Sequence, residues 1–157
     1  MNIRILAVGK TDSKPLVKLI SDYENRLRHY VRFEIVTLPD IKNVKNLSEV
    51  QQKDKEGEAI LKNLETSDIL ILLDEKGKLL SSVDFSNFLQ KKMNSGIKRL
   101  VFAIGGPYGF SETVYESAQG KISLSKMTFS HQMVRLFIVE QLYRAFTILR
   151  NEPYHHG

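Results

Sequence analysis

The stretch Asp68-Ile-Leu-Ile-Leu-Leu73 decides the fold class of this chain. Its last five residues are apolar without interruption, which is typical of a strand buried on both faces of a parallel sheet. The segments 2–8 (NIRILAV) and 99–104 (RLVFAI) have a similar character and predict two further buried strands. A sheet of this kind needs a helical layer on each face, so we expect helices between the strands.

The other segments supply those helices. Apolar residues recur at helical spacing over 15–29, and Ser48 with Gln51 forms the pattern of a capping box. The alternation predicts an α/β fold, with a mostly parallel sheet and helices on both faces. The expected elements are strands at 2–8, 33–38, 68–73, 99–104 and 121–124, helices at 15–29, 48–64, 83–93, from Ser111 and at 130–150, a loop at 40–47 and a turn at 75–78.

In parallel sheets, ligands bind outside the carboxyl ends of the strands. Three loops with unusual residues follow such ends, after Leu73, after Ile104 and after Leu124. The second is the glycine-rich segment 105–109 (GGPYG), whose adjacent glycines permit close backbone approach to a ligand. The alternative is a tight strand-to-helix turn. The segment is not the G-x-G-x-x-G pattern, and Gly9-Lys10-Thr11 has Arg4 where a phosphate-binding loop needs its first glycine, so neither predicts a nucleotide fingerprint.

Composition narrows the class of protein. The 157 residues suit one domain, 1–157, with a substantial core. There is no cysteine, no apolar run long enough to cross a membrane and no signal peptide, so we expect a cytoplasmic protein without a membrane partner. The net charge is +5, and no acidic residue occurs between Glu116 and Glu140. Chance explains this gap, or it marks a positive patch that faces a phosphate or carboxylate.

The final predicted helix is apolar on more than one face, which indicates burial on two sides. A central helix in a monomer explains this, but in a small domain we expect the second side to pack on another subunit. Glu140 and Arg144 are four residues apart and predict an ion pair within the helix. The tail carries Tyr154, His155 and His156, which suit base recognition or proton handling better than a metal site, because no other ligand lies at suitable spacing.

These motifs together resemble a known family. The chain is similar to the large-subunit ribosomal RNA methyltransferase H group of the SPOUT superfamily, and the similarity covers its full length. The residues that carry the resemblance are Ala7-Val-Gly-Lys10, Lys55-Glu-Gly57, Leu70-Ile-Leu-Leu-Asp74 with Gly77-Lys78 and Ser81-Ser82, Ile104-Gly-Gly-Pro-x-Gly109, Leu124-Ser-x-Met-Thr, His131-x-x-x-Arg135, Glu140-Gln-Leu-Tyr-Arg-Ala-Phe and Pro153-Tyr-His155.

The resemblance implies an α/β fold with a trefoil knot in its C-terminal part, and a homodimer. It implies S-adenosylmethionine as cofactor, and methylation of N3 of a pseudouridine in 23S ribosomal RNA within the assembled 70S ribosome. No DNA partner is expected. Two alternatives stay open, a methyltransferase for another RNA base, such as a tRNA uridine, and a ribosome-associated RNA-binding protein without catalysis.

The resemblance also implies roles for particular residues. His155 is the expected group for proton transfer, with Tyr154 beside it, and the tail could act across the dimer. Arg135, Arg144 and Lys121 are expected to contact RNA. The cofactor is expected against loop residues that follow the strands, namely Leu73, Gly105, Leu124, Ser125, Lys126, Met127, Thr128 and Phe129.

Overall fold

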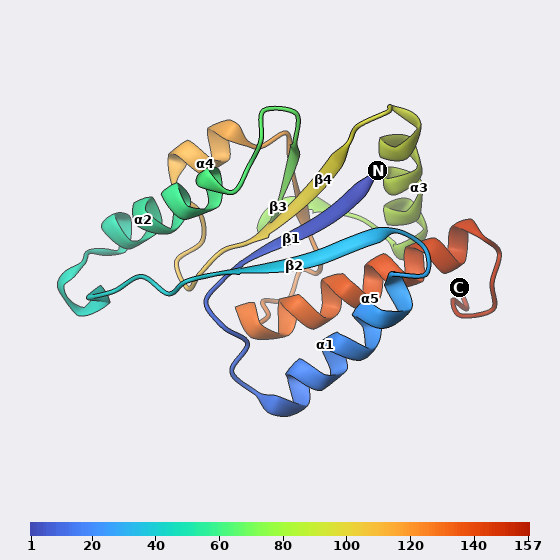
Figure 1. The fold of residues 1–157 in the computed structure, drawn as a ribbon, viewed down its shortest axis with the longest axis horizontal. Helices are drawn as coiled ribbons and strands as arrows, with labels where there is room; N and C mark the ends of the chain where they lie inside the picture. The colour runs from blue at the N-terminus through green and yellow to red at the C-terminus, as the bar shows by residue number, and fades with distance from the viewer.

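A computed structural model describes all residues, 1–157, as five strands alternating with helices (Figure 1). Each strand is followed by a helix along the chain, as the sequence predicted, although the bounds differ by a few residues. The elements are β1 (Asn2–Val8), α1 (Lys14–Leu27), β2 (Arg32–Leu38), a 3-10 turn η1 (Val44–Asn46), α2 (Glu49–Lys62), β3 (Ile69–Leu79), α3 (Ser82–Asn94), β4 (Arg99–Ile104), α4 (Glu112–Ser117), β5 (Gly120–Ser123) and α5 (His131–Leu149).

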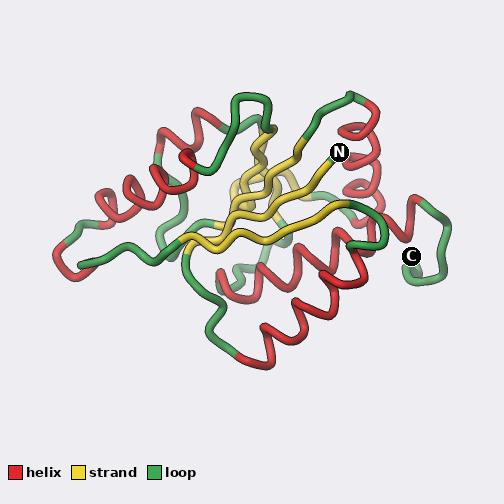
Figure 2. Tube along the Cα trace, viewed as in Figure 1, coloured by secondary structure: helices red, strands yellow, loops and turns green.

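The five strands form one sheet in the order β2-β1-β4-β3-β5, and all neighbouring pairs are parallel (Figure 2). Alternate strand residues build two separate cores. Ile3, Ile5 and Phe102 face a core shared with α1, α3 and α5, whereas Leu6 and Val101 face a core shared with α2 and α4. The expected arrangement of a parallel sheet with helices on both faces is therefore confirmed.

Side-chain caps begin the helices where the sequence placed them. The Ser48 hydroxyl accepts from the Gln51 amide, and the Gln51 side chain accepts from the Ser48 amide, which completes the predicted capping box of α2. Ser81 and Ser130 likewise accept from the amide three residues on, at the starts of α3 and α5. Each cap satisfies an amide that the helix itself leaves free, and so fixes where the preceding loop ends.

The turn expected at 75–78 is instead an irregularity inside β3. Leu73 and Lys78 both align with Ile122 of β5, so the residues between them bulge out of the ladder. A β-carbon on Gly77 would lie 2.6 Å from the Ile122 backbone, and only glycine permits this close approach of the two strands. The bulge places Asp74 and Lys76 beside the carboxyl ends of the neighbouring strands.

Helix α5 lies across one face of the sheet, alongside α1 and α3 (Figure 1). Ile138 and Leu142 are fully buried in the core on this face. On another side of α5, Leu136 and Phe137 are only partly buried and Met133 is 37% exposed, so an apolar strip stays accessible in one chain. None of the helices combines the length and apolarity needed to cross a membrane.

Candidate functional site

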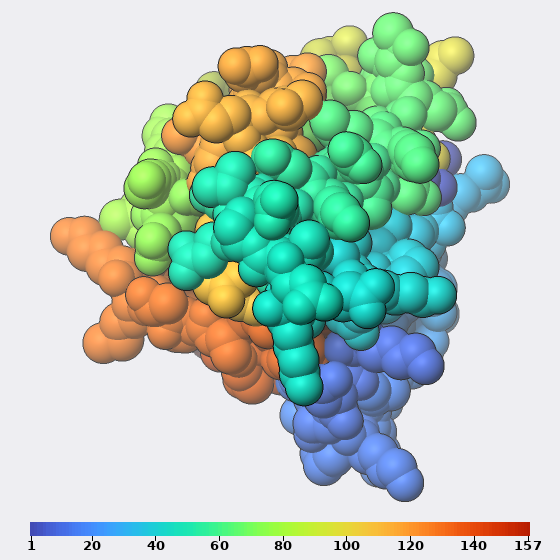
Figure 3. Space-filling model, turned by 90° about the vertical axis from the view of Figure 1, so that its left-hand side faces the viewer, coloured from blue at the N-terminus to red at the C-terminus, as the bar shows by residue number.

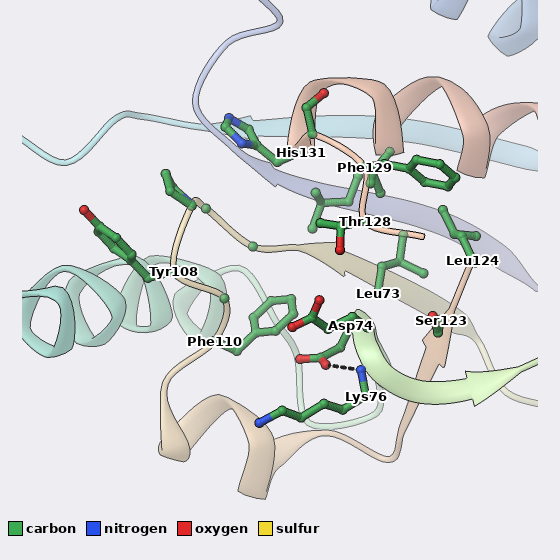
Figure 4. A pocket seen from close by; sticks show the side chains of 18 of the residues that line it. Leu73, Asp74, Lys76, Tyr108, Phe110, Ser123, Leu124, Thr128, Phe129 and His131 are labelled. Atoms are coloured by element: carbon green, nitrogen blue, oxygen red, sulfur yellow. Dashed lines mark hydrogen bonds between the residues drawn. The ribbon is translucent and has the colours of Figure 1, made fainter. Parts of the chain in front are cut away.

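A cavity of about 700 Å³ opens at the carboxyl ends of β3, β4 and β5. The three loops that the sequence singled out meet there, because neighbouring parallel strands end at the same edge of the sheet. Figure 4 shows Leu73, Leu124, Thr128 and Phe129 around the cavity, with His131 at the start of α5. The expected ligand position at this edge of the sheet therefore coincides with a real hollow.

Seven of the eight residues expected to hold the cofactor line this cavity. Lys126 does not, and its exposed side chain leaves the loop toward solvent. Phe129 is fixed by the Phe137 ring of α5, with the ring centroids 4.8 Å apart, whereas Met127 is 76% exposed. The seven lining residues are Leu73, Gly105, Leu124, Ser125, Met127, Thr128 and Phe129.

Asp74 and Tyr115 form a polar pair in the wall of the cavity. The Tyr115 hydroxyl donates to Oδ2 of Asp74, and the Lys76 amide donates to Oδ1 over 2.8 Å. The bond from Lys76 is local, whereas the partner of Asp74 on α4 was not foreseen from the sequence. Burial and the Asp74 carboxylate raise the pKa of Tyr115, so its hydroxyl stays protonated at neutral pH.

Further lining residues come from segments that sequence reasoning did not connect with the loops. Lys53 projects from α2, Tyr108 from the glycine-rich loop, and Glu112 from α4. Lys121, expected to contact RNA, does not line the cavity. It is exposed near the rim, with Nζ 5.4 Å from the centre of the Tyr115 ring.

Arg135, an expected RNA contact, is instead buried. It is 2% exposed, and its guanidinium donates to the carbonyls of Val8 and Gly9 over 2.8 and 2.7 Å, and to Thr11. These bonds fasten the start of α5, just after the 124–129 loop, to the end of β1. Arg135 is buried because it lies on the face of α5 that packs against the sheet, and its charge therefore cannot reach a ligand outside.

Tyr154 and His155 of the tail form a cluster with side chains near the carboxyl end of α5. Arg144 donates to Glu140 over 2.5 Å, which confirms the expected ion pair, and its Nη1 lies 3.2 Å from Nδ1 of His155. The Tyr154 hydroxyl donates to the same Glu140 carboxylate over 2.9 Å, and the Arg144 guanidinium stacks over the Tyr154 ring. The hydroxyl of Tyr23 on α1 is 3.2 Å from that of Tyr154. We call these five residues the tail cluster.

The tail cluster sets the charge state of its members. Burial, the bond with Tyr23 and the Glu140 carboxylate raise the pKa of Tyr154, so it is a hydrogen-bond donor and not a base at neutral pH. The bond to Glu140 raises the pKa of Arg144. Tyr154, one of the two expected catalytic side chains, is therefore engaged as a donor to Glu140 and is not available as a proton acceptor.

The cavity and the tail cluster are not adjacent within one chain. His131 lines the cavity and Arg144 lies thirteen residues further along α5, which corresponds to about 20 Å at 1.5 Å per residue. A second, smaller hollow of about 310 Å³ lies between these regions, beside Phe129, Phe137 and Gln141. Gln141 connects to the tail cluster by donating to Glu140 over 3.0 Å.

Comparison with known proteins defines the class of this chain. The family model described as "Predicted SPOUT methyltransferase" matches residues 1–155. The chain belongs to the SPOUT methyltransferase family, and the resemblance seen in its motifs is confirmed. The fold expected from that family, an α/β sheet with a C-terminal trefoil knot, agrees with the all-parallel sheet described above.

Curated relatives carry one more specific name. A protein called "Ribosomal RNA large subunit methyltransferase H" from Flavobacterium johnsoniae is 70% identical over 156 residues, which is 99% of each chain. Proteins with the same name from Parabacteroides distasonis and Bacteroides thetaiotaomicron are 64% and 53% identical, again over 99% of each chain. The similarity therefore runs through both the cavity loops and the tail cluster.

Proposed function

We propose that this chain methylates N3 of a pseudouridine in 23S ribosomal RNA, with S-adenosylmethionine as methyl donor and the assembled 70S ribosome as substrate. It acts in the cytoplasm as a homodimer. The observation that carries the proposal is the cavity at the ends of β3, β4 and β5, in a chain of this family whose full-length relatives are named as ribosomal RNA methyltransferases.

The cavity suits S-adenosylmethionine in size and chemistry. Ligand sites of this size combine apolar walls with a few polar groups, and Leu73, Leu124 and Phe129 provide apolar surface for an adenine. The amides of Gly105 and Thr128 donate to no backbone carbonyl and are free for the edge of the base. Asp74, held by Tyr115, offers carboxylate charge to a cofactor that carries a positive sulfur.

The chemistry asks two things of the protein. When bound, S-adenosylmethionine supplies an activated methyl group. The chain must hold the target base in line with that group, which is catalysis by proximity. It must also accept the weakly acidic proton of N3, and His155 is the group we assign to this step. Arg144 fixes the His155 ring from one side, and Glu140 fixes Arg144.

Separation along α5 supports action of the tail across a dimer. About 20 Å of helix lies between the cavity and the tail cluster, so His155 of one chain does not reach its own cavity in this arrangement. The accessible apolar strip of Met133, Leu136 and Phe137 starts beside the cavity and supplies surface for a second copy. A twofold dimer over this strip would bring each tail toward the partner's cavity.

Mixing two inactive variants tests this arrangement. Thr128→Trp fills the cavity from an exposed loop position, and His155→Ala removes the proton acceptor but leaves the cavity intact. If the tail acts across the dimer, a 1:1 mixture refolded together regains about a quarter of wild-type activity, because half of the dimers hold one intact composite site. No recovery in a mixture shown to contain heterodimers would place the tail in its own chain's site.

RNA contact is proposed for a surface where arginines stack on tyrosines. Arg144 lies over Tyr154, Arg150 lies 4.6 Å from the centre of the Tyr30 ring, and exposed Arg26 lies 5.1 Å from that of Tyr23. Guanidinium and aromatic planes are the groups on which unpaired bases stack. Arg26→Ala and Lys121→Ala should each lower the slope of log binding constant against log salt by about 1.

The decisive experiment follows the label of S-adenosylmethionine onto 70S ribosomes, free 23S RNA and tRNA. We expect label on 70S ribosomes alone, at one pseudouridine, because a compact chain has little surface for reading sequence and depends on the shape of the assembled particle. Label on tRNA would favour another RNA base. Cofactor binding without label anywhere would direct the search to other RNAs, and no cofactor binding would favour a non-catalytic RNA-binding protein.

A further inference from the structure

The side chain of Glu56, on α2, is buried without an adequate hydrogen-bond partner. Glu56 is 4% exposed, and no donor contacts its Oε1 atom. Oε2 receives only a long bond of 3.4 Å from Gln52, one turn earlier on the same helix. Buried acceptors are normally paired, so an unpaired carboxyl oxygen in the interior calls for an explanation beyond packing.

The carboxyl lies directly behind the glycine-rich loop 105–109. A β-carbon built on Gly106 would lie 2.8 Å from Oε1 and 2.9 Å from Cδ of Glu56, so the carboxyl is packed closely against the backbone of the loop. Gly57, which follows Glu56 on α2, closely approaches Val114 and Ser111 at the start of α4, just beyond the loop. Figure 3 shows α2, in teal, at the front of the molecule beside α4, in light orange. Helix α2 therefore backs the loop whose other side lines the cavity.

This loop has free donors as well. The Gly109 amide donates to the Gly106 carbonyl over 3.2 Å in an antiparallel bridge between these two residues, whereas the amides of Gly105 and Tyr108 donate to no backbone carbonyl. An unpaired buried acceptor thus faces a loop with unpaired amides. A small movement of the loop brings a donor onto the Glu56 carboxyl, whose buried Oε1 has no partner until then.

The charges around Glu56 also leave its carboxyl without a stabilising partner. Burial and the nearby Asp40 carboxylate raise the pKa of Glu56. No cation forms an ion pair with it, and Lys53, three residues earlier on the same helix, lines the cavity. A carboxyl kept in this environment is costly for the fold, and replacement of such groups by apolar residues is often stabilising.

We propose that Glu56 is a positioning residue for cofactor binding. Its carboxyl supports the loop 105–109 from behind and becomes the hydrogen-bond acceptor for an amide of the segment 106–109 when the loop closes on the cofactor, while the Gly105 amide stays free for the base. The inference rests on the proposed function, in that the ligand of the cavity is S-adenosylmethionine. Glu56 does not touch the ligand, and its effect is on affinity through the loop.

A matched pair of variants tests the role. Glu56→Gln keeps an acceptor oxygen at the same place, whereas Glu56→Met keeps the volume and loses the acceptor. We expect Glu56→Met to bind S-adenosylmethionine at least tenfold more weakly by calorimetry, yet to melt at or above the wild-type temperature. Glu56→Gln should bind within threefold of wild type. Glu58→Met, at an exposed position of the same helix, is the control and should change neither quantity.

The kinetics provide a second readout. Glu56→Met should raise the KM for the cofactor at least tenfold and leave kcat within a factor of three, because the loop is misplaced but the reacting groups are not. Unchanged affinity in Glu56→Met, or equal weakening in Glu56→Gln, would overturn the positioning role alone. If wild-type protein itself does not bind S-adenosylmethionine, the proposed function falls first and the positioning role falls with it.

Discussion

The two ends of α5 differ in what one chain can accomplish. At the first end, three loops and His131 line an open cavity with apolar walls and with loop amides that donate to no backbone carbonyl. At the other end, Glu140, Arg144, Tyr154 and His155 form a bonded cluster that encloses nothing. One end combines a place for a ligand with titratable side chains such as Asp74, Tyr115 and His131, whereas the other has a hydrogen-bonded cluster of polar side chains outside the cavity.

On the proposed mechanism, in which His155 accepts the N3 proton, ligand binding and proton transfer are located at different ends of α5. Cofactor affinity should depend on the loops and on the groups that fasten them, Arg135 and Glu56. Turnover should depend on the tail cluster, with cofactor affinity untouched. Variants that separate the two quantities therefore test the comparison directly.

Removal of His155 should have the largest effect. In His155→Ala we expect turnover on 70S ribosomes to fall about 10²- to 10⁴-fold, the usual contribution of a positioned acid or base. Cofactor affinity, measured by calorimetry, should stay at the wild-type value because the cavity is about 20 Å away along the helix. His156→Ala, one residue on and exposed, is the control. Near-normal turnover of His155→Ala would remove this side chain from the mechanism.

Replacement of Arg135 removes the hydrogen bonds that fasten the amino end of α5, beside the cavity, to the end of β1. Arg135→Met deprives the buried Val8 and Gly9 carbonyls of their donor, so we expect unfolding in urea to cost about 3 kcal/mol less than in wild type. Cofactor affinity should fall as well, since the 124–129 loop loses its anchor. Lys121→Met, which removes an exposed cation, should leave stability within about 0.5 kcal/mol. A stable Arg135→Met protein would show that the anchor is dispensable.

Asp68, at the amino end of the sheet, provides a reference substitution that should change stability without affecting either end of α5. Asp68 pairs with Arg99 over 2.6 Å; burial opposes the charge, but the bonds from Arg99 and the Glu65 amide outweigh it and lower the pKa of Asp68. Because the pKa of Asp68 is lower in the folded than in the unfolded protein, the charged carboxylate stabilises the fold at any pH above its unfolded pKa. This stabilisation is lost as the pH falls through the folded pKa. Asp68→Asn should therefore cost about 2 kcal/mol at pH 7.

The same variant should cost progressively less below about pH 4, in urea titrations repeated across the acid range. Turnover of the folded protein should not change at pH 7. A pH-independent difference in stability would contradict the ion pair as its source.

The smallest effect is expected where the tail is tied to the body of the chain. The Tyr30 hydroxyl donates to Glu152 over 2.5 Å, and this bond raises the pKa of Tyr30 to about 12. Tyr30→Phe should reduce stability by about 1 kcal/mol. Hydrogen exchange should increase in the segment 150–156 but not in the cavity loops. Equal increases in both segments would show that the two ends of α5 are not independent.

Local patterns predicted the parts of the molecule that depend on local interactions. Continuous apolar runs identified β3 and β4, and the capping-box pattern of Ser48 and Gln51 located the start of α2. The loops after Leu73 and Ile104 were expected at a ligand site because they follow the carboxyl ends of buried strands, whereas the choice of Leu73 and Gly105 as cofactor residues came from the family resemblance. The bulge in β3 was missed, since it depends on how Gly77 approaches Ile122 of another strand.

Pairings between distant segments could not be read from the sequence. Arg135 looked like one of several basic residues near an acid-free stretch, and only the packing of α5 shows that its charge points inward. Tyr115 meets Asp74 across 41 residues, and Lys53 comes to the cavity from α2 on the far face of the sheet. Sequence spacing carries no record of such contacts.

Strand order has a consequence for synthesis. β5 is made last but pairs with β3, and the 124–129 loop and α5 follow it along the chain. During translation, one edge of β3 therefore stays unpaired until β5 has left the ribosome. The cavity between their carboxyl ends cannot form before then. The protein acquires its binding ability only at the end of its own production, so a chain cut short is an inert product and never a misdirected enzyme.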